Sequence, residues 1–184
     1  DVEDAIAAPP PAQVPWAEVF RQAPASTLLA TGLGTGLLPK APGTWGSLLA
    51  LGLSEGVFAL AGLPAVALLA AASTAVGVPV SARVAQLRGA KDPPEIVVDE
   101  VAGQAIALAL LHAVLPASAE APLRWGLVAL AFALFRLFDV SKPGPIVRAQ
   151  SLPRGWRALA DDLPAGLLAG IAAALPDGDS RLLP

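Results

Sequence analysis

Carboxylates that adjoin apolar segments are the residues of this chain whose types and spacing point to chemistry. Asp99 and Glu100 stand side by side just before the apolar run 101–115, in which Gln104 and His112 are the strongly polar residues. A charged side chain at the mouth of an apolar segment costs several kcal/mol unless it is paired, hydrated or bound to a metal. We therefore interpret this pair as part of a candidate functional site. His112 has no partner at metal-ligand spacing, so we expect a satisfied interior or surface histidine.

Two further charged clusters occupy similar boundaries. Arg136, Asp139 and Lys142 lie at the end of another apolar segment, and Asp161 and Asp162 begin a later one. Arg136 and Asp139 are i, i+3 neighbours on a helix, so a salt-bridged helix end is an alternative explanation for the first cluster. Acidic residues that complement a first helical turn would explain one residue of the second cluster, but not both. Three such clusters are the main indication of function.

Residues 31–47 form a glycine-rich stretch with five glycines and two prolines, which exclude a regular helix or strand through most of it. Exposed N–H groups in such a loop, at Gly34 for example, can hold an anion. Lys40, Thr44 and Ser47 add a cation and two hydroxyls. We expect Ser47 to cap a helix that begins there, and a helix N-terminus attracts phosphate. The alternative is an irregular loop, since the spacing of a Walker A motif is missing.

The elements that must position these residues are predicted to be helices. Apolar segments are separated by Pro and Gly breaks and show no sustained alternation of period two. We expect an all-α fold, a single bundle of about six apolar helices. Within it we expect two helices of roughly 15 residues between 48 and 78, broken near Gly62 and each too short to span a membrane comfortably. The later helices are expected at 96–115, at 123–141 and from about residue 158, and the charged stretch 83–92 is expected to be a loop.

Three parts of the chain are distinguished by composition. We expect a flexible, Pro-rich N-terminal tail over residues 1–25, a helical catalytic domain over 26–176 and a C-terminal tail over 177–184. Trp16, Val19 and Phe20 would form at most a short amphipathic turn that touches the core or a membrane. The proline run at residues 9–11 excludes a helix through the whole first segment.

Composition favours a membrane or membrane-surface protein. The chain is 55% hydrophobic and 15% charged, where soluble domains carry about 25% charged residues. A soluble, Ala-rich helical bundle is the alternative. The net charge of −3 and the missing basic patch argue against nucleic acid as a partner. With no cysteine, a thiolate nucleophile, a disulfide and a Cys-ligated zinc are excluded.

In combination and order, the motifs resemble the bacterial phosphatidylglycerophosphatase A family. The matching segments are Thr-Gly-Leu-Gly-Thr-Gly and Pro-Gly-Thr-Trp-Gly-Ser in the glycine-rich stretch, Ile-Val-Val-Asp-Glu with Gly103, Phe-Arg-Leu-Phe-Asp with Lys142, and the final Asp-Asp pair with Gly166. One departure is local: residues 154–157 read Arg-Gly-Trp-Arg, where family members often have Gly-Gly-x-Gly.

The resemblance implies an all-helical, magnesium-dependent phosphatase at the cytoplasmic face of the bacterial inner membrane. It would hydrolyse the terminal phosphomonoester of phosphatidylglycerophosphate and give phosphatidylglycerol and phosphate. Mg²⁺ takes oxygen ligands and bridges carboxylates to a substrate phosphate, which suits such chemistry. The implied ligands of one or two Mg²⁺ ions are Asp99, Glu100, Asp139, Asp161 and Asp162. One of these carboxylates would also serve as the general base.

Cations would neutralise the charge that develops on the phosphoryl oxygens. Arg136 and Lys142 are the expected catalytic cations, beside the catalytic carboxylates Asp99, Glu100, Asp139 and Asp162. The expected substrate-binding residues are Gly34, Lys40, Thr44, Ser47 and Lys142.

Three other interpretations stay open at this point. A family relative that dephosphorylates a soluble phosphomonoester would share these residues. A membrane transporter or ion-binding protein would also place carboxylates between apolar helices. A non-catalytic helical scaffold would use the acids only as partners of Arg and Lys, so that their replacement would change stability rather than turnover.

Overall fold

The computed structural model of the protein describes residues 13–116 and 119–141. Helices are the only regular elements in these two ranges, so the prediction of an all-α fold is confirmed. The helix expected from about residue 158 lies outside the described residues. The elements are α1 (Trp16–Gln22), α2 (Pro24–Ala30), the 3-10 turn η1 (Thr35–Leu37), α3 (Pro42–Ala61), α4 (Leu63–Arg88), α5 (Val98–Val114) and α6 (Ala121–Ser141).

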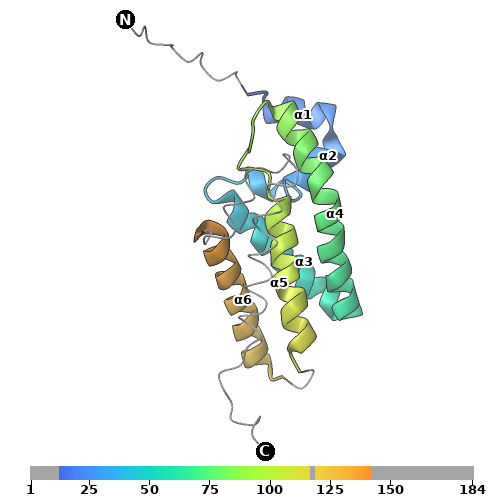
Figure 1. Cartoon of the computed structure of the whole chain (residues 1–184), viewed down its shortest axis with the longest axis vertical. Coiled ribbons are helices and arrows are strands. Elements are labelled where there is room, and N and C mark those ends of the chain that lie inside the picture. The colour runs from blue at the N-terminus through green and yellow to red at the C-terminus, as the bar shows by residue number, and fades with distance from the viewer. Residues whose placement is uncertain (1–12, 117–118, 142–184) are drawn as a thin grey trace, which may run out of the picture.

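Helix α5 is the centre of the bundle and packs against α3, α4 and α6 (Figure 1). Its buried face is built largely from small residues such as Ala102, Ala105 and Ala107, each 0% exposed. Small side chains let neighbouring helices approach closely, and Ala107 packs against Phe135 of α6. Together these contacts fix the ends of α3 and α6 relative to the acidic first turn of α5.

Part of the segment assigned to the N-terminal tail belongs to the folded protein. Helix α1 places Val19 in a cluster with residues of α4 and α5, at 0% exposure, and the Trp16 indole Nε1–H donates to Glu95 Oε1 at 3.2 Å. The prolines do not prevent helix here because they stand at helix starts: Pro15 precedes α1 and Pro24 opens α2. Proline is tolerated at a helix N-terminus, where its missing N–H has no intrahelical partner anyway.

Helices α3 and α4 are longer than the sequence indicated, with 20 and 26 residues, although their break at Gly62 was predicted. The expectation that both are too short to span is therefore wrong. Helix α3 begins at Pro42, and α4 continues through Pro79 and ends at Arg88, where Gly89 caps it in the left-handed conformation. The prediction that Ser47 caps the helix is wrong, because α3 already begins at Pro42 and Ser47 lies inside it.

The prediction that the stretch 83–92 is a loop is wrong for Arg83 and Arg88. They lie in the last turns of α4 rather than in a loop, while Lys91 and Asp92 follow the helix. The helix persists past its apolar part because Val80, Val84 and Ala85 still face the core.

Helices α3 and α4 are both long and apolar enough to cross a membrane by length and composition. Only 22% of the most apolar window of each helix is buried, whereas the core helix of a soluble protein would be mostly buried. Their outer faces expose large apolar side chains, among them Leu48, Leu53, Leu60 and Leu68. Such a surface supports association with a membrane rather than the soluble alternative.

Candidate active site

Three helix ends meet at one level of the bundle. The first turns of α3 and α5 lie beside the last turns of α6, because α6 runs antiparallel to both (Figure 1). The first turn of α5 carries Asp99 and Glu100, and the last turns of α6 carry Arg136 and Asp139. Two of the three charged clusters predicted from the sequence are thus brought to the same end of the molecule.

Arg136 links α6 to α3. Its Nη1 donates to Asp139 Oδ2 at 2.5 Å and to Ser47 Oγ at 3.4 Å. The Arg136 and Asp139 side chains are 18% and 12% exposed, so the pair is shielded from bulk water on most sides. Ser47 Oγ donates in turn to the Gly43 carbonyl at 2.9 Å. The chain of contacts holds the guanidinium in a fixed position at the start of α3.

Gly43 is the point where α3 touches both charged groups. A Cβ at this position would lie 2.3 Å from Glu100 Oε1 and 3.1 Å from Arg136 Nη1. The carboxylate of α5 and the guanidinium of α6 therefore both lie against the bare backbone of the first turn of α3. Sequence reasoning did not single out Gly43, although it stands within the Pro-Gly-Thr-Trp-Gly-Ser motif.

Asp99 is the most perturbed carboxyl group of this site. Burial raises its pKa, a hydrogen bond with the Glu100 carboxyl group opposes that shift, and the charges of Asp92 and Asp139 add to it. Its Oδ1 atom is buried and has no hydrogen-bond partner among the described residues. A buried carboxylate oxygen without a donor is a position that a cation can satisfy.

The described part of the site fits a magnesium ion through its donor chemistry. Mg²⁺ is commonly bound by one or two carboxylates, with waters and substrate phosphate as the other ligands. Asp99 and Glu100 supply two adjacent carboxyl groups. Within residues 13–116 and 119–141, no group of three Asp, Glu, His or Cys side chains is arranged to hold a metal. The predicted ligands Asp161 and Asp162, and the predicted catalytic Lys142, lie outside the described residues.

The glycine-rich loop packs rather than presenting free N–H groups. The Gly34 N–H donates to the carbonyl and hydroxyl oxygens of Thr31, and the N–H of Gly36 donates to the Thr31 carbonyl. A Cβ at Gly36 would lie 2.2 Å from the Glu95 carbonyl oxygen. Gly36 thus serves the close approach of the loop to the segment before α5, whereas Gly34 has a φ of 90° and no atom within 4 Å of an added Cβ. Because the N–H groups of both glycines are already bonded within the loop, the geometry does not provide the anion cradle that the sequence indicated.

The other predicted substrate-binding residues lie around the start of α3. Thr44 is half-buried in the first turn, beside Gly43, and Ser47 contacts Arg136 as described. Lys40 is exposed in the preceding loop and has a φ of 64°, followed by Ala41 at 48°. No contact among the described residues joins Lys40 or Gly34 to the carboxylates.

A second charged cluster lies at the opposite end of the same helices. His112 Nε2 and Glu55 Oε1 are 2.8 Å apart, and Arg124 Nη2 donates to Glu55 Oε2 at 2.6 Å. The His112 ring stacks on Phe58 with centroids 3.8 Å apart. His112 is an interior histidine, one of the two predicted alternatives, and its Nε2 is paired with Glu55, but its buried Nδ1 has no hydrogen-bond partner among the described residues. The partnership with Glu55 was missed, although Glu55 is the only charged residue of α3.

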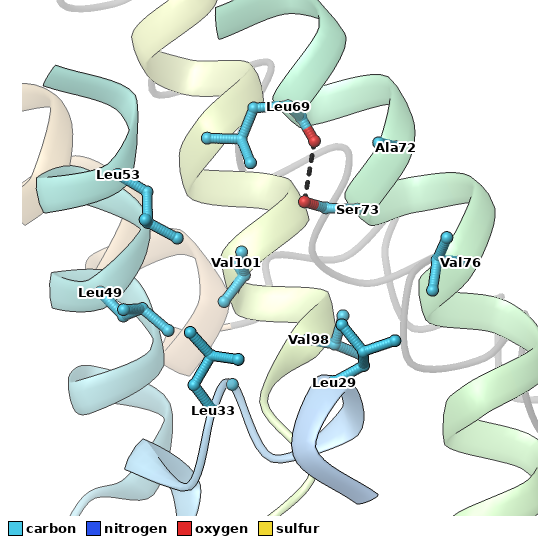
Figure 2. A pocket seen from close by; sticks show the side chains of 11 residues that line it. Leu29, Leu33, Leu49, Leu53, Leu69, Ala72, Ser73, Val76, Val98 and Val101 are labelled. Atoms are coloured by element: carbon cyan, nitrogen blue, oxygen red, sulfur yellow. Dashed lines mark hydrogen bonds between the residues drawn. The ribbon is translucent and has the colours of Figure 1, made fainter. Parts of the chain in front are cut away.

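An apolar pocket of about 290 Å³ lies on the other face of α5 (Figure 2). Leu49 and Leu53 of α3 face Leu69 and Val76 of α4 across it, and α5 forms its floor. Among the described lining residues, Ser73 is the one with a hydroxyl, which already donates to the Leu69 carbonyl at 2.8 Å. The lining within this part of the chain has no charged group to bind a phosphate, so the pocket is distinct from the charged site and suited to an apolar chain.

These features define a class: a membrane-associated helical bundle in which carboxylates of α5 and α6 and an arginine of α6 form one charged site against the first turn of α3. Comparison with known proteins is consistent with this class. The family model described as phosphatidylglycerophosphatase A matches residues 28–176. The chain therefore belongs to the phosphatidylglycerophosphatase A family, as its motifs indicated.

Curated relatives cover most of the chain. A phosphatidylglycerophosphatase A of Haemophilus influenzae is 35% identical over 145 residues, which are 78% of this chain and 83% of the relative. A protein of the same name from Escherichia coli is 34% identical over 148 residues, 78% of this chain and 79% of the relative. A putative phosphatidylinositol-3-phosphatase of Bacteroides thetaiotaomicron is 34% identical over 154 residues, 80% of this chain and 91% of the relative. No solved structure gives a match.

Proposed function

We propose that this protein is a membrane-associated phosphatase that hydrolyses the terminal phosphomonoester of phosphatidylglycerophosphate to phosphatidylglycerol and phosphate. The observation that carries the proposal is the meeting of Glu100, Arg136 and Gly43 at one point. Carboxylates beside a fixed guanidinium are better suited to binding a phosphate dianion with a cation than to forming a cation pathway. A transport path for cations would not place an arginine in its centre. Family membership and the names of the relatives support the same reaction.

The reaction is the attack of water on phosphorus, with cleavage of the bond between phosphorus and the lipid alcohol oxygen and transfer of a proton to that oxygen. Arg136 would bind the phosphoryl oxygens, and Asp139 would hold the guanidinium in place for them. Ser47 and Thr44 would add hydroxyl contacts at the start of α3, and Lys40 and Lys142 would supply further positive charge. A carboxylate of the site would accept the proton of the attacking water.

We propose Mg²⁺ as the cofactor. Asp99 and Glu100 would hold it, joined by Asp139, Asp161 and Asp162 as predicted from the sequence, and the ion would neutralise charge on the phosphoryl group. The support is the buried Asp99 oxygen without a donor and the raised pKa of this carboxyl group.

We propose that the site faces the cytoplasm from the inner membrane. Basic residues flank membrane segments mainly on the cytoplasmic side. Of the Lys and Arg side chains in the described residues, Arg124 alone lies toward the far end of α6. The others lie at or beyond the end of the bundle that carries the charged site. They are Arg21, Lys40, Arg83, Arg88, Lys91 and Arg136.

A phosphate-release assay with pure protein in detergent tests the function. We expect Mg²⁺-dependent release from phosphatidylglycerophosphate, abolished by EDTA and by Glu100→Gln. Phosphatidylinositol 3-phosphate and glycerol 3-phosphate serve as the competing lipid and soluble substrates. Faster release from either competitor would reassign the substrate, and no release from any of the three would refute the phosphatase. A Glu100→Gln protein that lost stability but kept full turnover would favour the scaffold alternative.

A further inference from the structure

Gln104 is a fully buried polar side chain that the described structure leaves without a partner. It is 0% exposed, and neither its Nε2 nor its Oε1 atom has a hydrogen-bond partner among the described residues. An amide group in this situation loses its hydrogen bonds to water and gains nothing in return. Buried polar groups are nearly always hydrogen-bonded, so this exception requires an explanation.

The position of Gln104 connects it to the charged site. It lies one helical turn after Glu100 on α5, and residues four apart share one face of a helix. Glu100 lies against Gly43 and Arg136, and Ala107, almost one turn further along, packs against Phe135 of α6. Gln104 therefore occupies the level between the charged groups and the apolar seam below them.

The direction of the side chain strengthens this connection. Each Cα–Cβ bond of a helix tilts toward the helix N-terminus, so a residue covers the turn before its own position. For Gln104 that turn is the one with Asp99 and Glu100. This general direction of helical side chains aims the Gln104 amide toward the floor of the charged site.

We propose that Gln104 is a further phosphate-binding residue of this site, whose Nε2–H donates to a phosphoryl oxygen held beside Glu100 and Arg136. This inference rests on the proposed function, since it assigns one more contact to the same ligand. A phosphate monoester dianion has three non-bridging oxygens that need donors. The Nη1 of Arg136 is already engaged by Asp139 and Ser47, and a neutral amide adds donors without repelling that guanidinium.

The test compares Gln104→Met and Gln104→Ala with the unchanged protein, each as the full chain in detergent with Mg²⁺. Methionine keeps the length of the side chain and removes its donors. We expect the melting temperature of Gln104→Met to be equal or higher, because an unsatisfied amide is replaced by an apolar group. We expect both variants to bind inorganic phosphate at least tenfold more weakly, as measured by calorimetry. Their kcat/KM on the lipid should fall ten- to hundredfold.

Ser81→Ala is the matched control. Ser81 of α4 is also buried with an oxygen that lacks a partner among the described residues, and it lies on a helix that carries none of the described charged groups of the site. Its removal should leave the melting temperature equal or higher and leave phosphate affinity and kcat/KM within twofold. A parallel loss in the control would overturn the inference, because it would show a general packing effect.

Two outcomes separate this inference from the proposed function. If the lipid is hydrolysed and Gln104→Met retains phosphate affinity and kcat/KM within twofold, the inference is wrong while the function stands. If none of the proteins hydrolyses the lipid, yet phosphate binds the unchanged protein and not Gln104→Met, the inference stands while the function falls. An unchanged protein that binds no phosphate would overturn the inference as well.

Discussion

At the scale of single residues, the site depends on a missing side chain. Glu100 and Arg136 approach the first turn of α3 closely because Gly43 has no Cβ. The same principle applies at Gly36, where the neighbouring atom is the Glu95 carbonyl oxygen of the backbone. A side chain such as that of Glu100 can move aside, whereas a backbone carbonyl cannot. The two glycines should therefore differ in what they control, catalysis at Gly43 and folding at Gly36.

Gly43→Ala should lower turnover while leaving the fold intact. The new methyl group would displace the Glu100 carboxylate, and a misplacement of about 1 Å can reduce a rate by roughly a hundredfold. The free energy of unfolding should change by less than about 1 kcal/mol, since alanine also favours the helix. Phosphate release and thermal denaturation measure the two effects. Gly52→Ala is the control, because it lies on the same helix with no atom within 4 Å of its added Cβ, and it should keep full activity.

At the scale of elements, the loop that leads into α3 is strained. Lys40 and Ala41 are consecutive non-glycine residues with positive φ, and each costs about 1–2 kcal/mol relative to the usual conformations. The strain turns the chain sharply into Pro42, so that α3 begins beside the charged groups. Backbone strain of this kind is often found at functional sites, and here one of the two residues carries a positive charge.

Lys40→Gly and Ala41→Gly separate the strain from the charge. Both should leave the free energy of unfolding unchanged or raise it by about 1 kcal/mol, because glycine adopts positive φ at little cost. Only Lys40→Gly should lower kcat/KM, roughly tenfold, which corresponds to about 1.4 kcal/mol of lost transition-state stabilisation. Equal activity of both variants would remove Lys40 from the substrate-binding residues. Equal loss in both would assign the effect to the loop conformation.

The cluster of Glu55, His112 and Arg124 joins α3, α5 and α6 at their other end. Replacement of one member of a buried ion pair leaves an uncompensated charge and costs about 3 kcal/mol or more. Glu55→Gln should therefore lower the free energy of unfolding by about that amount. The folded fraction should keep the kcat/KM of the unchanged protein, because the cluster is remote from the site. A stable Glu55→Gln protein with low activity would contradict this structural role.

At the scale of the whole molecule, the distribution of apolar surface determines where the protein resides. Only 22% of the most apolar window of α3 and of α4 is buried, and the basic residues of the described ranges gather near the charged site. The charged site therefore lies at one end of the apolar surface of α3 and α4. A lipid substrate with a phosphate headgroup fits this arrangement, because its headgroup and its chains would meet surfaces of matching polarity.

The membrane attachment should resist salt and alkaline washing. Apolar burial is insensitive to ionic screening, whereas attraction between basic residues and anionic lipids weakens as salt increases. After washing of membranes with 1 M NaCl or alkaline carbonate, the protein should remain in the pellet and should be released by detergent. Release by salt alone would show that charge, and not the surface of α3 and α4, holds it at the membrane.

The amino-acid sequence by itself determined the class of elements and the identity of the charged motifs. Helices were predictable because apolar segments and Pro or Gly breaks are local features, and the Arg136–Asp139 pair follows from i, i+3 spacing. The positions of the helix ends were harder to predict from the sequence. The expected helices lay between residues 48 and 78, yet Pro42 starts α3 and Pro79 is accommodated within α4. Tertiary packing of Val80 and Val84 outweighs the local cost of Pro79.

Only the tertiary structure decided which residues meet. The antiparallel course of α6 brings Arg136 to Ser47, which lies 89 positions earlier in the chain. A local sequence pattern cannot predict a contact between residues so far apart. The same holds for Glu55 and His112, and for Gly43, whose role depends on side chains from two other helices. Gln104 is polar in the sequence, but its lack of a partner is a property of the packed bundle alone. Contacts between distant segments depend on how whole helices pack, which spacing along one helix cannot reveal.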